Sequence, residues 1–196
     1  MLGAMTPRQA GKGGNPGQPT QGLTLIELML TLTITAVLLA VAIPQMRELI
    51  ARKRLAGVAN EMVTDMRFAR TMVIDRSQPI LVRFGSTANQ WCYTVFSEGV
   101  GAGNLCDCTA TPICPNVSNP PIALKSVYVR QDSGITLSSV PAVLLFTQFA
   151  GPADPAVLNI QLQSSLGGTV RVGLASAGRA TVCTVSGQLN DFKACP

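Results

Sequence analysis

A long apolar segment near the start of the chain is the clearest feature of its hydrophobic pattern. It runs from Leu23 to Ile43, and 16 of its 21 residues are apolar. Its polar members are one glutamate, Glu27, and four threonines. Because a helix of about 20 apolar residues spans the hydrocarbon core of a bilayer, the pattern predicts a transmembrane helix over this segment.

A second, amphipathic pattern follows the apolar segment. The stretch Arg47–Arg76 holds no proline and a single glycine, Gly57. Apolar residues recur there at steps of three and four, which places them on one face of a helix. These residues are Leu55, Ala59, Met62, Met66, Ala69 and Val73. We expect one helix over Leu23–Arg76, bent or loosened at Pro44 and ended by Pro79, with this face docked on the rest of the chain.

The remaining residues, 79–196, have the pattern of a β-rich head. Runs rich in β-branched and aromatic residues alternate with turn-forming residues. The candidate strands are Ile80–Phe84, Trp91–Phe96, Ser126–Arg130, Val143–Phe149, Val157–Gln163, Thr169–Leu174 and Arg179–Val185. Gly167-Gly168 and Ser176-Ala177-Gly178 separate the last three, so these are expected to form an antiparallel meander. The sequence predicts an α+β fold, a long N-terminal helix packed on a small antiparallel β-sandwich head.

The residues at the start of the apolar segment form a distinct motif. In Gly22-Leu23-Thr24-Leu25-Ile26-Glu27 a glycine precedes the apolar run and a carboxylate lies five positions after that glycine. A charge at the centre of a membrane segment costs about 2.5–3.5 kcal/mol on insertion scales, so such a residue is usually paired and functional. The motif resembles the processing site of type IV prepilins and type II secretion pseudopilins.

This resemblance implies a role for each residue of the motif. A membrane peptidase, the prepilin peptidase, cuts between the residues equivalent to Gly22 and Leu23 and methylates the new amino terminus. Glu27 becomes the fifth residue of the mature chain, where the family keeps its glutamate. Pro44 becomes the twenty-second, where many members have a helix-bending proline. The first mature residue is usually Phe in the family and is Leu23 here.

Two other kinds of N-terminal segment are weighed against a prepilin. A secretory signal peptide has an apolar core of about 7–15 residues followed by a cleavage site of small residues. The apolar segment here is longer than that, and Gly22 precedes it. A plain signal anchor would satisfy the length but gives no reason for Gly22 and Glu27. The motif therefore favours the prepilin interpretation.

We expect four parts along the chain. Residues 1–22 are a leader rich in Gly, Pro and Gln, which cannot build a core. Residues 23–43 form the transmembrane helix, residues 44–78 its amphipathic continuation, and residues 79–196 the head. Charge does not orient the membrane segment, because Arg8 and Lys12 precede it and four basic residues follow it closely. The cleavage motif and the cysteines favour an inner-membrane protein with a cytoplasmic N-terminus and a periplasmic head, which then enters a filament.

Six cysteines follow the apolar segment. They are Cys92, Cys106, Cys108, Cys114, Cys183 and Cys195. An even number of cysteines in an exported head indicates disulfides, and six allow fifteen connectivities. Position alone favours Cys183 with Cys195, a pair that would fix the C-terminal tail. A zinc site is the rival explanation, but the chain has no histidine and lacks the paired C-x-x-C spacing of common zinc folds. We expect neither a metal nor a cofactor.

The composition also argues against an enzyme and against a strongly basic binding protein. Without histidine there is no Ser-His or Cys-His nucleophile pair. The chain has 15 basic and 10 acidic residues, and removing Arg8 and Lys12 with the leader leaves 13 basic residues and a net charge of +3. That excess is mild compared with the charge of a typical nucleic-acid-binding domain.

Nearly all of residues 22–196 resemble the GspH/FimT family of minor pilins and pseudopilins, specifically at the N-terminus and loosely in the head. The similarity rests on the prepilin motif, the long helix, the size of the head and Gly178-Arg179-Ala180-Thr181 near the C-terminus. Some FimT-type members bind DNA through a GRxR motif, and here Thr181 replaces its second arginine. Arg171, Arg179 and Lys193 are the candidate DNA contacts, although solvated strand residues are the plainer explanation.

Two functions therefore follow from the sequence. The first is a structural subunit of a type IV pilus or of a type II secretion pseudopilus, with prepilin peptidase and other pilin-like subunits as its partners in the inner membrane. The second is a DNA-binding minor pilin that acts in DNA uptake during transformation.

Overall fold

The computed structural model describes Gly22 and residues 24–99, 103, 105–147, 159–175, 179–187 and 189–195. The chain divides into two compact units, Met1–Val41 and Ala42–Pro196. The expected leader up to residue 21, the first mature residue Leu23 and the expected turn at residues 176–178 lie outside the described residues.

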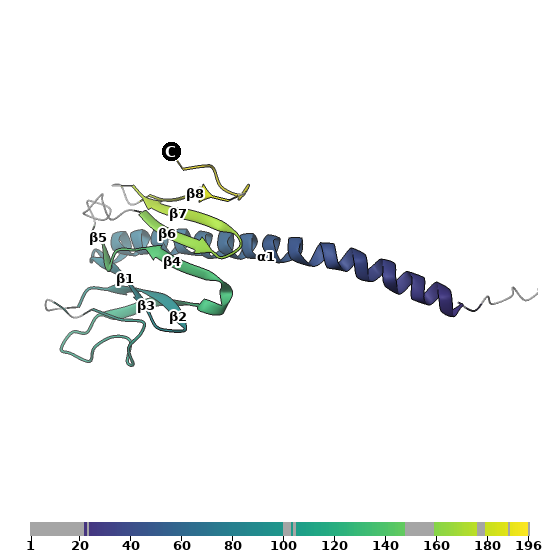
Figure 1. The fold of residues 1–196 in the computed structure, drawn as a ribbon. Helices are drawn as coiled ribbons and strands as arrows, with labels where there is room; N and C mark the ends of the chain where they lie inside the picture. The colour runs from purple at the N-terminus through teal and green to yellow at the C-terminus, as the bar shows by residue number, and fades with distance from the viewer. Residues whose placement is uncertain are drawn as a thin grey trace, which may run out of the picture. The chain divides into compact units, whose positions relative to one another are not determined.

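One helix, α1 (Leu25–Arg76), contains both of the helical patterns of the sequence (Figure 1). Thr24 begins it, because the Thr24 Oγ1 accepts a hydrogen bond from the N–H of Glu27 at 3.3 Å, as an N-cap residue does. The helix continues through Pro44. It ends before Ser77, whose φ of 52° is left-handed and common just after a helix. The long helix predicted from the sequence is confirmed, with its first turn starting at Leu25.

The second half of α1 packs against the head through the face predicted from the sequence. The six residues of that face, Leu55, Ala59, Met62, Met66, Ala69 and Val73, are each 0% exposed. They share one hydrophobic core with buried residues of the β-strands. Three arginines of α1 add polar contacts at the edges of this core, because Arg54, Arg67 and Arg70 donate hydrogen bonds to backbone carbonyl oxygens of the head.

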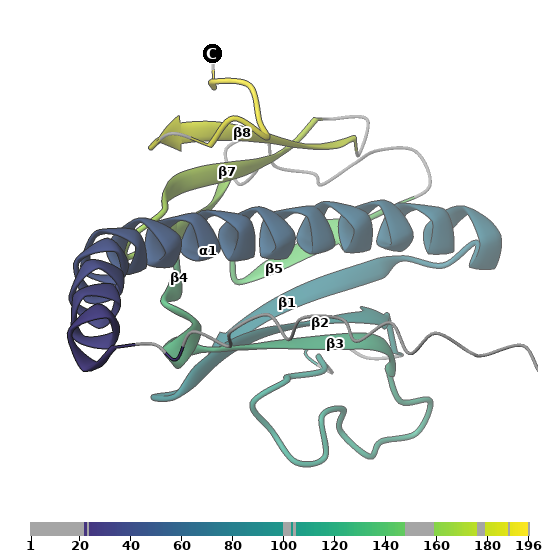
Figure 2. The same ribbon diagram turned by 90° about the vertical axis from the view of Figure 1, so that its right-hand side faces the viewer.

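The head contains two four-stranded antiparallel sheets. Sheet A has the strand order β3-β2-β1-β5 and sheet B the order β4-β6-β7-β8. In sheet A the strands are β1 (Ile80–Ser86), β2 (Gln90–Ser97), β3 (Ile122–Arg130) and β5 (Val143–Phe146). In sheet B they are β4 (Ile135–Ser139), β6 (Asn159–Ser164), β7 (Gly168–Leu174) and β8 (Ala180–Ser186). A short 3₁₀ helix, η1 (Gln131–Ser133), joins β3 to β4. Figure 2 shows β1–β3 on one side of the second half of α1 and β7 and β8 on the other.

The predicted meander of the last three strands is confirmed. β6 pairs with β7 and β7 with β8, each antiparallel. The sequence missed β4 and the first four residues of β3, which starts at Ile122 where we expected Ser126. Parts of the expected strands Val143–Phe149 and Val157–Gln163 fall outside the described residues.

Strand β2 is covered on both of its faces. Trp91, Tyr93 and Val95 point into the core beneath α1. On the opposite face Phe96 packs in a second, smaller cluster with Leu81 and Cys106, which comes from the loop between β2 and β3. That loop is tied down by two disulfides, so the long connection between these neighbouring strands acts as a cover for the sheet.

Candidate assembly residues and candidate DNA-binding residues

The expected processing motif lies at the exposed start of α1. Gly22 is exposed and has no atom within 4 Å of the position that a Cβ would occupy. Leu23, on the other side of the expected cleavage point, lies outside the described residues. Glu27, at the first turn of α1, is also exposed. Thr24 and Glu27 have the spacing of a capping box, in which a threonine caps the helix and an acidic residue three positions later reaches back to it.

The polar side chains of the apolar half of α1 differ in whether they have a hydrogen-bond or ion-pair partner within the chain. Thr31 Oγ1 donates to the carbonyl of Leu28 at 2.9 Å, and Thr33 Oγ1 donates to that of Leu30 at 2.8 Å. Thr35 Oγ1 donates to the carbonyl of Thr31 at 2.7 Å. Such backbone bonds let a hydroxyl enter a membrane without an external partner. Glu27, in contrast, forms no ion pair within the described part of the chain.

The apolar half of α1 exposes far more continuous apolar surface than soluble monomeric proteins usually do. It is the one described helix that is long and apolar enough to cross a membrane, and its apolar stretch is 0% buried. Leu25 and Ile26 are 78% and 76% exposed. Soluble monomers rarely expose continuous apolar surface of this extent. The surface therefore needs lipid or other subunits to cover it.

Three of the four basic residues that follow the apolar half, Arg52, Lys53 and Arg54, are bound within the chain. Arg52 pairs with Glu48 one helical turn earlier. The Lys53 Nζ lies 3.0 Å from the Asp191 carboxylate in the C-terminal tail. The Arg54 guanidinium donates to the carbonyl of Ser133 at 3.3 Å. These contacts attach the tail and the β3–β4 connection to α1.

The three candidate DNA contacts lie on β7, just before β8 and in the C-terminal tail. Arg171 lies in the middle of β7, opposite Cys183 of β8, and is half-buried; its Nε is buried without a hydrogen-bond partner. Arg179 is exposed just before β8, four residues from Cys183, which corresponds to about 13 Å along an extended strand. Lys193 is exposed in the tail, and its carbonyl accepts the N–H of Thr184.

All six cysteines form disulfides. Cys183 is bonded to Cys195, which is the pair that the sequence favours. The other four give Cys92–Cys108 and Cys106–Cys114. The first of these joins β2 to the β2–β3 loop, and the second closes a small ring within that loop.

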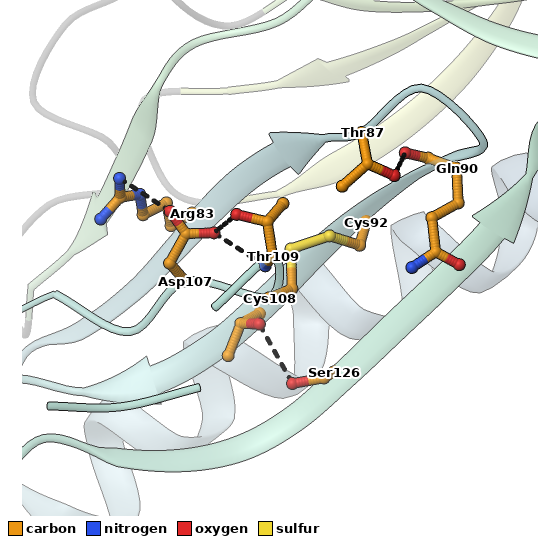
Figure 3. The surroundings of a disulfide bond; sticks show 9 residues. Arg83, Thr87, Gln90, Cys92, Asp107, Cys108, Thr109 and Ser126 are labelled. Carbon is orange, nitrogen blue, oxygen red and sulfur yellow. Dashed lines mark hydrogen bonds and ion pairs between the residues drawn. A yellow bond between two sulfur atoms is a disulfide. The ribbon is translucent and has the colours of Figure 1, made fainter. Parts of the chain in front are cut away.

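Asp107 lies between two of these cysteines and fixes the loop to sheet A (Figure 3). Its Oδ1 accepts hydrogen bonds from the N–H and the hydroxyl of Thr109, at 2.8 and 2.6 Å. Its Oδ2 lies 3.0 Å from the guanidinium of Arg83 on β1. The Thr109 hydrogen bonds, assisted by the positive charge of Arg83, hold the pKa of Asp107 below its usual value. Asp107 is thus a structural residue of the loop.

A buried polar cluster between α1 and sheet A escaped the sequence analysis. Asp65 is 2% exposed and accepts a hydrogen bond from the Tyr93 hydroxyl at 2.8 Å. The Lys125 Nζ donates to the other Asp65 oxygen at 2.6 Å. Burial and the Asp65 contact raise the pKa of Tyr93, and the hydrogen bond to Asp65 raises the pKa of Lys125. The signal in the sequence was a carboxylate adjacent to Met66, at the edge of an otherwise apolar helical face.

The head also has a cleft of about 430 Å³ at the ends of β1 and β4. Its lining has no acid and no base: it comprises Phe84, Gly85, Ser86, Trp91, Gln131, Thr136, Leu137, Val140, Pro141 and Ala142. Within the described ranges there is also no group of three or more metal-ligating side chains. The arrangement thus offers structural contacts and exposed surfaces for association.

Comparison with known families covers both halves of the chain. The family described as type II transport protein GspH matches residues 58–188, about two thirds of the chain. The prokaryotic N-terminal methylation motif matches residues 18–43, which include Gly22, Leu23 and Glu27. No curated protein and no solved structure gives a significant match. The chain therefore belongs to the GspH family of type IV prepilin-like proteins, whose members are structural minor pilins or pseudopilins of type II secretion systems or pili.

Proposed function

We propose that the chain is a minor pseudopilin of a type II secretion system. Residues 1–22 are its leader, and prepilin peptidase removes them between Gly22 and Leu23 and methylates Leu23. Residues 23–43 cross the inner membrane with the N-terminus in the cytoplasm. Residues 44–78 and the head, 79–196, lie in the periplasm until the subunit enters the pseudopilus.

The observation that carries this proposal is that the threonine hydroxyls of the apolar half of α1 have hydrogen-bond partners within the helix, whereas the carboxylate of Glu27 has no ion-pair partner in the described structure. The hydroxyls of Thr31, Thr33 and Thr35 are bonded to backbone carbonyls of their own helix, whereas Glu27 forms no ion pair in the described structure. A carboxylate in lipid is costly unless it is paired. The processed N-terminal amine of a neighbouring subunit is a cation at the right depth, because it lies only four residues from Glu27 in each chain. Glu27 therefore pairs with the Leu23 amine of a neighbour.

The same helix supplies the filament interior. Its apolar surface is exposed in the single chain, and packing against copies in other subunits removes that surface from lipid and water. Pro44 lies at the end of this segment, where it lets the lipid-embedded part adjust to its neighbours without moving the docked second half. The head faces outward from the filament.

Two substitutions test processing and assembly separately. Gly22→Ala should block removal of the leader, and the uncleaved chain should be visible as a larger band on an immunoblot; a band of normal mature size would contradict the assigned cleavage point.

Glu27→Leu should be cleaved normally yet be absent from purified filaments. Thr33→Val is the matched control, because Thr33 is already satisfied within its own helix and its loss should leave assembly intact. Wild-type amounts of Glu27→Leu in filaments would contradict the pairing.

The secreted proteins of a strain lacking this subunit test which machine it serves. If specific exoproteins disappear from the medium and return on complementation, the subunit acts in secretion. If secretion is unchanged while pili are lost, it belongs to a type IV pilus.

DNA uptake is the alternative function, and the exposure of Arg179 is the observation in its favour. A gel shift with short duplex DNA at low and moderate salt tests it, because phosphate contacts weaken steeply with salt. Arg179→Ala should then weaken binding, whereas Arg76→Ala, an exposed cation at the end of α1, should not. Absence of any shift at low salt would remove this function.

A further inference from the structure

The turn between β6 and β7 presents a large apolar side chain where a polar one is expected. The turn comprises Ser165, Leu166 and Gly167, and Leu166 at its tip is 58% exposed. Turn positions favour Gly, Pro, Asn, Asp and Ser, which satisfy the backbone at little cost. The conformation of the turn does not require leucine at position 166. The exposed side chain of Leu166 is therefore available for a contact outside the chain.

The turn is held in a fixed place beside α1 (Figure 1). The buried hydroxyl of Ser164 accepts a hydrogen bond from the N–H of Gly167 at 3.2 Å. The N–H of Ser165 donates to the carbonyl of Gly134 at 3.1 Å. A Cβ on Gly167 would lie 3.2 Å from the backbone nitrogen of Arg52 in α1, so the glycine permits this close approach. Leu166 is thus presented by a rigid turn.

The turn lies next to the point where the apolar half of α1 ends. Ser165 and Leu166 line a groove of about 580 Å³ together with Ile43, Pro44, Arg47 and Glu48. Ile43 is the last residue of the apolar segment that spans the membrane in the proposed topology. Ile43 and Ile50 are 48% and 51% exposed, so the apolar surface continues past Pro44 on α1 beside the turn.

Positive charge accompanies this apolar surface. Arg47 is exposed, lines the same groove as Leu166 and forms no ion pair with any described residue. Arg47 and Arg54 line an adjoining groove with Leu166, and the acid in that groove, Asp132, is paired with Arg130. An apolar side chain flanked by arginines matches the boundary of a bilayer, where apolar groups enter the acyl region and guanidinium groups meet lipid phosphates.

We propose that the β6–β7 turn is a second membrane contact, in which Leu166 inserts into the headgroup–acyl boundary of the bilayer that holds α1 and Arg47 binds lipid phosphate. This inference rests on the membrane anchoring described under Proposed function. Continuity with the membrane segment selects lipid as the occupant, because Ile43 and Leu166 line one groove. The contact holds the head at the membrane surface before assembly. It is lost when the subunit leaves the bilayer and enters the filament.

Tryptophan fluorescence of the full chain in proteoliposomes tests this contact. The chain has a single tryptophan, Trp91, which is 4% exposed in the head and provides the background signal. Leu166→Trp adds a probe at the turn. Val140→Trp, at an exposed apolar position beyond the far end of β4, is the matched control. Each variant is reconstituted in phosphatidylethanolamine–phosphatidylglycerol vesicles whose acyl chains are brominated at a shallow or a deep position, and flotation of the vesicles establishes that the chain is anchored.

We expect shallow bromines to quench the emission added by Leu166→Trp at least twofold, deep bromines to quench it less, and the emission added by Val140→Trp to be unchanged. Ser165→Trp, at the neighbouring exposed position, is a second probe if the first variant fails to fold.

A chain that does not float with the vesicles contradicts the membrane anchoring itself. A chain that floats without quenching of either turn probe overturns the second contact. Equal quenching of Val140→Trp overturns it as well, because the head would then touch lipid without preference. If quenching is absent but Leu166→Asp still blocks filament formation, the turn contacts another subunit and the lipid assignment is wrong.

Discussion

Replacing Asp65 by alanine should destabilise the head more than any other single change of a carboxylate on α1. Asp65 is buried between α1 and sheet A and accepts hydrogen bonds from Tyr93 on β2 and Lys125 on β3. It therefore links the helix to two neighbouring strands. The Asp65→Ala variant removes the acceptor and leaves both donors in place.

The two donors that lose Asp65 contribute unequally to the expected loss, because Lys125 keeps Glu61 at 3.6 Å whereas the Tyr93 hydroxyl has Asp65 as its hydrogen-bond acceptor. The Tyr93 residue is 1% exposed, so its hydroxyl is left without a partner in the core, which costs about 1–3 kcal/mol. The Lys125 side chain is 39% exposed and its ammonium can turn to water, so its lost ion pair costs about 0–1 kcal/mol, as at a surface. Together these contributions predict that Asp65→Ala lowers the free energy of unfolding by about 1–4 kcal/mol.

Urea unfolding of a soluble fragment, residues 45–196, followed by Trp91 fluorescence measures this loss. The fragment keeps every residue of the hydrophobic core, which begins at Leu55. Asp75→Ala is the matched control, because Asp75 is an exposed carboxylate on the same helix; its effect should stay within about 0.5 kcal/mol. The double variant Asp65→Ala/Tyr93→Phe should be less destabilised than the sum of the single variants by about 1 kcal/mol, because it no longer buries an unpaired hydroxyl. Wild-type stability of Asp65→Ala, or additive effects in the double variant, would refute this account.

Three further predictions concern the head. Replacing both Cys183 and Cys195 by serine should lower the free energy of unfolding by about 2–4 kcal/mol in urea, since the bond closes a short loop at the C-terminus; an unchanged midpoint would contradict this. Hydrogen bonds from Thr109 lower the pKa of Asp107, so its contribution is present above the ordinary pKa of 3.8 and is lost as the pH falls through the lowered value. The wild type should therefore lose more stability between pH 5 and pH 3 than Asp107→Asn, and equal losses would argue against it. Gly168→Ala should cost about 1–3 kcal/mol in the same assay, because φ is 100° there and a Cβ would overlap the backbone of β8; a neutral result would contradict the strain.

The docking face of α1 could be predicted from the sequence because it depends on one periodicity. Residues at steps of three and four from Leu55 to Val73 must share a helical face whatever they pack against. The meander of β6, β7 and β8 could also be predicted, because its strands are rich in β-branched residues and short glycine-containing stretches separate them. Periodicities and turn residues of this kind do not depend on the tertiary contacts, so they can be interpreted from the sequence alone.

Strand β4 and the start of β3 could not be predicted, because their pairing is decided by distant residues. In β4 only Ile135 is buried, and the strand forms an edge of sheet B against β6. The first residues of β3 are exposed, and they pair with the end of β2 across a register shift between Val95 and Phe96. Exposed edge residues carry little hydrophobic pattern, so the backbone partner alone makes them strands.

The candidate site residues also fall into two groups, those that local sequence separations predict and those that only the folded structure brings together. Gly22, Glu27 and Pro44 could be proposed from the sequence as processing and assembly residues, because the motif that they form depends only on fixed separations along the chain. The Asp65 cluster and the groove at Leu166 join residues that are far apart in the sequence, 28 positions for Asp65 and Tyr93. No local pattern shows such a contact, and only the folded head brings the residues together.

The energetics of Glu27 link the free subunit to the filament. Asp65 is a buried carboxylate with two partners supplied by its own head, and it stabilises the fold of the single chain. Glu27 is a carboxylate in an exposed apolar helix whose neighbouring threonines are satisfied internally, and no described residue forms an ion pair with it. Under the proposed topology and pairing, its unpaired charge raises the free energy of the subunit in the bilayer, and an amine brought by a neighbour lowers the free energy of the assembled state. The Glu27→Leu variant should therefore be the more stable protein in the membrane and the weaker one in assembly.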